Sequence, residues 1–127
     1  MTDETTELLA LTQRLLDSIT LGDWATYEEL CDVSLTAFEP EAPGQLVAGL
    51  DFHRFYFDLG GVRGRHQTTM AAPHVRVMGD VAVVCYARLI QRVGPEGAPV
   101  TVASTETRVW QRQGASWRHV HFHRSPM

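Results

Sequence analysis

The sequence contains little that would support a disulfide framework, a membrane span or a nucleic-acid interface. Only two cysteines occur, and Cys31 and Cys85 each lie in an apolar pattern, which favours buried reduced thiols over a disulfide. No apolar run approaches the ~20 residues that span a bilayer, and the segment Met1–Glu7 is acidic where a signal peptide is basic. The net charge is -4 and there is no basic block. We therefore expect a cytoplasmic protein that binds neither membranes nor nucleic acid.

Several catalytic signatures are also missing. The sequence has no glycine-rich phosphate loop of the P-loop or dinucleotide type, no nucleophile-elbow sequence and no protein kinase signature. It also lacks a basic amphipathic helix of the kind that calmodulin binds. These absences argue against hydrolase, kinase and other nucleotide-dependent activities. We expect no cofactor and no binding to calmodulin.

Apolar periodicity predicts helices in the first half of the chain. Apolar residues recur at steps of three and four, and the expected helices cover residues 7–19, 24–31 and 50–59. Gly22 is suited to a left-handed helix end and Asp23 to capping the helix that follows. Residues 60–65 hold three glycines and no apolar period, which predicts a mobile connection.

The remaining segments predict a sheet within a single domain. Strands are expected over residues 35–39, 66–78, 80–93, 100–113 and 116–124. Short turns separate the last four strands, which favours an antiparallel meander. Helices followed by a long curled sheet indicate an α+β fold in which the sheet wraps the first helix. At 44% hydrophobic content the chain fits one domain, residues 1–127, with a flexible start at residues 1–6.

Three of the predicted strands each place one arginine among apolar or aromatic neighbours. Strand parity puts Arg88 on the face of Val84, Tyr86 and Ile90, Arg108 on the face of Glu106 and Trp110, and Arg124 on the face of Val120 and Phe122. A buried guanidinium needs a partner of opposite charge. In one interpretation the three arginines form ion pairs with Glu106, Glu39 or Asp58.

In the second interpretation the arginines converge with His53 and Tyr56 into a cationic pocket. Guanidinium groups match small carboxylates and phosphates bidentately, so such a pocket would bind a small anion. Arg108 and Arg124 must then share a face across the final hairpin. We expect a bulge at Gly114 to keep them together, with Val120 and Phe122 inward.

The row His119, His121 and His123 alternates along the last predicted strand, so the three side chains are expected on one side. Its ends lie roughly 13 Å apart at the usual rise of a strand, too far for one ion to contact all three. We therefore expect no metal site. An interface or solvent-facing role fits the row better.

Four blocks resemble the association domain of calcium/calmodulin-dependent protein kinase II. They are LTAFEPEA at residues 35–42, GLDFHRFYF at 49–57, ETRVW at 106–110 and HFHRS at 121–125. The similarity extends over nearly the whole chain from about Glu7. It implies a cone-like fold of the nuclear transport factor 2-like, or SnoaL-like, superfamily. It also implies homo-oligomers, dimers or larger rings, formed through sheet faces by a domain that stands alone here without a kinase domain.

The resemblance also bears on the pocket. The family's pocket arginines match Arg88, Arg108 and Arg124, and its histidine matches His53, in a site similar to a small-carboxylate receptor. The sequence departs from the family after Phe57, where DLGG replaces a longer loop that carries a tryptophan.

The leading hypothesis is a homo-oligomeric module with an anion pocket formed by Arg88, Arg108, Arg124, His53, Tyr56 and Glu106. A rival is a small cyclase or isomerase of the same superfamily, in which His53, Tyr56 or Glu106 moves protons. A third is a pure scaffold with an empty pocket.

Overall fold

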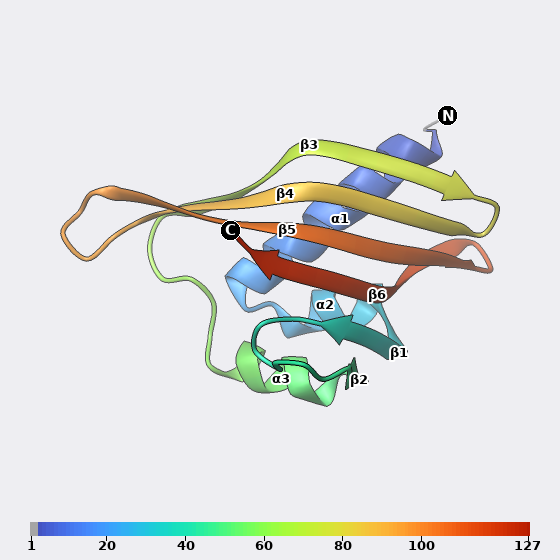
Figure 1. Ribbon diagram of the computed structural model, residues 1–127, viewed down its shortest axis with the longest axis horizontal. Coiled ribbons are helices and arrows are strands. Elements are labelled where there is room, and N and C mark those ends of the chain that lie inside the picture. The colour runs from blue at the N-terminus through green and yellow to red at the C-terminus, as the bar shows by residue number, and fades with distance from the viewer. Residues whose placement is uncertain (1–2) are drawn as a thin grey trace.

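The computed structural model describes residues 3–127, which form an α+β fold with a six-stranded sheet (Figure 1). The helices are α1 (Glu4–Leu21), α2 (Trp24–Leu30) and α3 (Asp51–Asp58). The strands are β1 (Cys31–Phe38), β2 (Val47–Ala48), β3 (His66–Met78), β4 (Val81–Val93), β5 (Pro99–Gln113) and β6 (Ser116–Pro126). The predicted helices and the four long strands are thus confirmed within a few residues.

Helix α1 begins three residues earlier than the apolar spacing predicted because the chain supplies a cap there. The Asp3 carboxylate accepts a hydrogen bond from the backbone N–H of Thr6 at 2.7 Å. At the other end Gly22 takes a left-handed conformation with φ of 72°. Residues 4–6 therefore belong to the helix. Met1 and Thr2 lie outside the described residues, and for them the flexible start remains a prediction.

The sheet has the order β2-β1-β6-β5-β4-β3. Strands β3 to β6 form the predicted antiparallel meander. Strand β1, however, pairs parallel with β6, as in the register Ala37↔Phe122, so the sheet is mixed. The short strand β2 was not predicted, and it pairs with β1 through Thr36↔Ala48. The pairing of β1 with β6 joins residues distant in sequence, which local periodicity does not encode, and β2 has only two residues and is too short to show a period.

The core lies between α1 and one face of the sheet. Figure 1 shows α1 crossing behind the strands, with α2 and α3 near β1 and β2. The buried apolar side chains come from both layers and include Leu8, Leu15, Leu16, Val84, Trp110 and Phe122. Burial alternates along β4, as expected for a strand with one covered face. No helix within residues 3–127 is long and apolar enough to cross a membrane.

The final hairpin keeps Arg108 and Arg124 on one face, but by a different route from the one predicted. A two-residue turn pairs Gln113 with Ser116, so there is no bulge at Gly114. The register instead shifts further along, between the pairs Val109↔His121 and Trp110↔His119. Val120 is therefore the extra residue of a β-bulge. Phe122 is buried as expected.

The bulge has a second effect, on the histidine row. Before it, His119 turns inward and has no exposed surface. After it, His121 and His123 face the opposite side of the sheet, where both rings contact Phe38. The expectation of three histidines on one side was therefore wrong, because parity reverses at a bulge.

Candidate functional site

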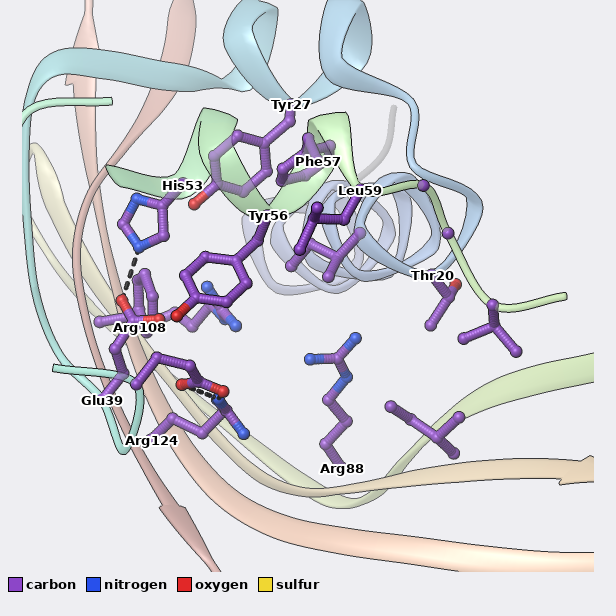
Figure 2. A pocket seen from close by; sticks show the side chains of 17 residues that line it. Thr20, Tyr27, Glu39, His53, Tyr56, Phe57, Leu59, Arg88, Arg108 and Arg124 are labelled. Carbon is purple, nitrogen blue, oxygen red and sulfur yellow. Dashed lines mark hydrogen bonds and ion pairs between the residues drawn. The ribbon is translucent and has the colours of Figure 1, made fainter. Parts of the chain in front are cut away.

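A cavity of about 440 Å³ lies between the inner face of the sheet, the C-terminal end of α1 and helix α3 (Figure 2). It is lined by Ile19, Thr20, Tyr27, Glu39, Glu41, His53, Tyr56, Phe57, Leu59, Gly60, Gly61, Val62, Arg88, Ile90, Arg108, Phe122 and Arg124. Five of the six predicted site residues are in this wall. The sixth, Glu106, is not among the lining residues and lies buried behind them.

Glu106 and Arg108 form a buried ion pair behind the cavity wall. Arg108 Nη2 donates to Glu106 Oε1 at 2.8 Å, and Arg108 Nε donates to the Tyr86 hydroxyl at 2.9 Å. The Tyr86 hydroxyl in turn donates to Glu106 at 2.7 Å. The Arg108 guanidinium also lies 4.3 Å from the centre of the Phe122 ring. Arg108 is therefore held by neighbours on several sides.

The charges in this group act on one another. Burial alone would raise the pKa of Glu106, but the positive charges of Arg108 and Arg88 lower it to about 2. Burial lowers the pKa of Arg108, but Tyr86 and Glu106 raise it by more than burial lowers it. The net shift is therefore upward. Glu106 is thus an ionised carboxylate whose main role is to neutralise arginine.

Arg88 has a different environment. Its Nη1 atom lies 3.4 Å from Glu106 Oε2, but its Nε and Nη2 atoms are buried and have no hydrogen-bond partner within residues 3–127. The side chain is only 6% exposed. Burial lowers the pKa of Arg88, and Glu106 offsets this only in part. Figure 2 shows its guanidinium projecting from the sheet into the cavity.

Arg124 lies at the more exposed side of the cavity and forms an ion pair with Glu41. The structure thus gives the three arginines different partners: Arg108 has Glu106 and Tyr86, Arg124 has Glu41, and Arg88 has one long contact. Both interpretations of the arginines apply in part. Neither Glu39 nor Asp58 is the partner of an arginine in the described ion pairs.

His53 and Tyr56 come from α3. His53 Nε2 lies 2.6 Å from Glu39 Oε2, and both side chains are buried. Its ring packs near Tyr27 and Phe122. Tyr56 is 42% exposed and directs its ring into the cavity beside Glu39 (Figure 2). His53 Nε2 is thus already engaged by a carboxylate, while Nδ1 is buried without a hydrogen-bond partner within residues 3–127.

Sequence reasoning did not find the rim of the cavity. The backbone N–H of Val62 donates to the Thr20 carbonyl at 2.7 Å. A Cβ on Gly61 would lie 2.5 Å from the Leu21 carbonyl carbon and closer still to the Thr20 carbonyl oxygen. Residues 60–65 were predicted to be a mobile connection, but the lack of a side chain at Gly61 allows the loop to pack directly on the end of α1. Glu41 was also missed, because nothing in its non-periodic segment marks it.

His119 supports Arg108 from the side opposite Glu106. Its Nε2 lies 3.5 Å from Arg108 Nη1, and its Nδ1 lies 3.4 Å from the Cys31 sulfur. Burial and the charge of Arg108 hold the pKa of His119 well below its ordinary value, so the ring is neutral. Burial raises the pKa of Cys31 to about 12, and both cysteines are free thiols. Within residues 3–127 no three metal-ligating side chains gather in a position to hold an ion.

The fold and cavity define the class of the protein. Helices lie on one face of a curved sheet that closes over a cavity, and this fold is shared with a protein of the nuclear transport factor 2-like superfamily. A member from Salmonella enterica has the same fold, with a TM-score of 0.76 and 23% identity over 94% of this chain and 88% of that chain.

The chain belongs to the calcium/calmodulin dependent protein kinase II association domain family, whose sequence model matches residues 4–127. The hub homology domain of Chlamydomonas reinhardtii is 48% identical, with a TM-score of 0.91 over 98% of this chain and 99% of that one. The rabbit (Oryctolagus cuniculus) type II kinase subunit delta is 47% identical over 122 residues. That alignment covers 94% of this chain but 23% of the rabbit subunit, so the chain spans less than a quarter of that relative.

Proposed function

We propose that this protein is a self-associating hub domain whose cavity binds a small organic anion, with Arg88 as the principal anchor. The observation that carries the proposal is the environment of Arg88: a buried guanidinium that projects into a cavity and makes one 3.4 Å contact with a carboxylate that Arg108 also engages. A buried charge is costly unless it is compensated. An anion in the cavity supplies that compensation.

A carboxylate fits the geometry. Its two oxygens can accept from the Nε and Nη2 atoms of Arg88 as a parallel pair of charge-assisted hydrogen bonds once the side chain turns this buried, unpartnered edge towards the cavity. Tyr56 adds a hydroxyl on the same side of the cavity, and Arg124 adds a second positive charge at the mouth. Arg108 contributes indirectly, because its ion pair holds Glu106 in place. The anchor is therefore Arg88, and the three arginines do not share the role equally.

Self-association is supported by membership of the association-domain family. It also fits the layer structure, because α1 covers one face of the sheet while the other face carries half-buried side chains such as Val83, Cys85, Thr107 and Val109. An apolar surface of this kind is a common site of contact between copies of a chain. A cytoplasmic location, and the absence of phosphotransfer and of calmodulin binding, remain predictions.

The rival acid–base enzyme has less support. Glu106 has a pKa of about 2 and lies behind the cavity wall, so it is a poor proton carrier near neutral pH. His53 Nε2 is engaged by Glu39. Tyr56 lies beside Glu39, but that carboxylate is already bonded to His53 Nε2 at 2.6 Å and is therefore not a free base for the phenol.

Two measurements test the proposal. Light scattering after size exclusion should give a mass of at least two chains at micromolar concentration, and a persistent monomer would contradict self-association. In thermal denaturation, butanoate should raise the melting temperature with the logarithm of its concentration once saturating, while butanamide should not. Arg88→Gln should remove the shift. The matched control Arg76→Gln removes the same charge from the exposed edge strand β3 and should keep it.

A further inference from the structure

The cavity has two unlike halves, and Arg88 lies between them. On one side Figure 2 shows Tyr56, Glu39 and Arg124, and on the other Thr20. The apolar lining residues assigned to the Thr20 side are Ile19, its neighbour in α1, with Val62 and Ile90, while Leu59 lies between Tyr56 and Thr20 in Figure 2. Val62 joins it through its hydrogen bond to Thr20, and Ile90 through strand parity, two residues beyond Arg88 on the same face of β4.

The apolar half is preformed. The hydrogen bond from Val62 to Thr20 and the close packing of Gly61 against Leu21 fix the loop that follows α3 on the end of α1. Ile90 belongs to a strand paired on both sides. A ligand therefore meets this surface without having to order it first, which removes a common cost of binding.

The size of the cavity exceeds what a very short acid needs. Its volume is about 440 Å³, whereas a water molecule occupies about 30 Å³ in the liquid. Pockets of about 300 to 1,000 Å³ usually hold ligands of drug-like size. An acid of two or three carbons on Arg88 would leave the apolar side chains facing water.

The charges set the polarity of the ligand. The half of the cavity beside Tyr56 carries two carboxyl groups, Glu39 and Glu41, which accept from His53 and Arg124. Because Glu41 already neutralises the charge of Arg124, a second negative group on the ligand would face these carboxyls on one side and apolar surface on the other. The site therefore disfavours dianions.

We propose that the cavity selects monocarboxylates with an extended apolar tail, the carboxylate on Arg88 and the tail against Ile19, Leu59, Val62 and Ile90. This inference rests on the proposed anion site and adds a ligand class to it. Since burial of one methylene is worth about fourfold in affinity, each added methylene should tighten binding by about that factor until the apolar half is filled.

The experiment is calorimetric titration of the parent protein with propanoate, pentanoate and heptanoate. Each step adds two methylenes and should lower Kd by about fifteenfold. Heptanamide tests the charge and heptanedioate tests the second carboxylate, and both should bind at least tenfold more weakly than heptanoate. These comparisons use unmodified protein, so they do not depend on the folding of a variant.

A surface variant locates the tail. Leu59→Ser should reduce the gain per methylene, because Leu59 lines the apolar half. Leu46→Ser is the matched control: Leu46 is 53% exposed against 68% for Leu59, and it lies outside the cavity wall. The control should keep the parent's dependence on chain length.

The possible outcomes separate the two proposals. Equal Kd values for all three acids, together with rejection of heptanamide, would overturn the apolar tail and leave the anion site standing. Tight binding of heptanamide would overturn the anion site and the inference together, as would the absence of any binding. A steady gain with chain length that Leu59→Ser reduces and Leu46→Ser preserves would support both.

Discussion

Replacing Arg108 by glutamine should destabilise the protein strongly even when no ligand is present. Arg108 is 1% exposed and lies 2.8 Å from Glu106, which is itself buried. Removing one partner of a buried ion pair typically costs about 3 to 5 kcal/mol, because it leaves the other charge uncompensated. At roughly 4 °C per kcal/mol for a domain of this size, the melting temperature should fall by about 10 to 20 °C.

The matched variant Arg88→Gln should behave differently. Arg88 makes one long contact with Glu106, and the burial of its charge is itself unfavourable. Losing the contact and relieving the buried charge oppose each other, so we expect a change within about 1 kcal/mol. Urea denaturation at neutral pH measures both variants against the parent.

This pair of variants also provides a refutation. If Arg88→Gln proves as unstable as Arg108→Gln, and carboxylates leave the parent's melting temperature unchanged, Arg88 is scaffolding and the anion site is wrong. If Arg108→Gln is as stable as the parent, the assignment of Arg108 to the structural ion pair is wrong.

Three further predictions follow. The pKa of Glu106 is about 2 in the folded protein against a reference of 4.5, so its contribution to stability is fully present above about pH 4.5 and is lost as pH falls towards 2. Glu106→Gln should therefore remove about 3 kcal/mol of the acid dependence of stability, measured by urea denaturation at a series of pH values. An unchanged pH profile would contradict the buried pair. Gly61→Ala should destabilise the protein by about 1 to 3 kcal/mol by forcing the loop away from Thr20. A loss below about 0.5 kcal/mol, which is the scatter of surface substitutions, would show that the loop moves away at little cost. In a Cys85→Ser background, a thiol reagent at pH 8 should label Cys31 only as fast as the protein unfolds, because the thiol is buried and its pKa is about 12. Rapid labelling of the folded protein would contradict this burial.

Much of the site was predictable from strand parity, because alternation is a local property. It correctly turned Arg88, Glu106 and Arg108 to the covered face. Their partners were not predictable in the same way. Glu106 and Arg108 lie on one strand and Arg88 on its neighbour, so which guanidinium meets the carboxylate depends on side-chain rotamers.

The parts that could not be predicted share a physical cause. The bulge at Val120 has neither glycine nor proline to mark it, so parity failed for His119 while the predicted facing of Phe122 held. The resemblance to the association domain correctly predicted the family and the fold. It left the loop after Phe57 open, and there the structure places Leu59 and a glycine contact on α1 at the cavity rim.

The parallel pairing of β1 with β6 has a consequence for how the chain acquires its structure. Thr36 and His121 are neighbours in the sheet although 85 positions separate them in the chain. Contacts at such separation close a long loop, and folds rich in them form slowly. During synthesis, β1 can pair with β6 only after nearly the whole chain has been made. A chain that stops before β6 would leave β1 and β5 each with an open edge, exposed to the pairing that leads to aggregation.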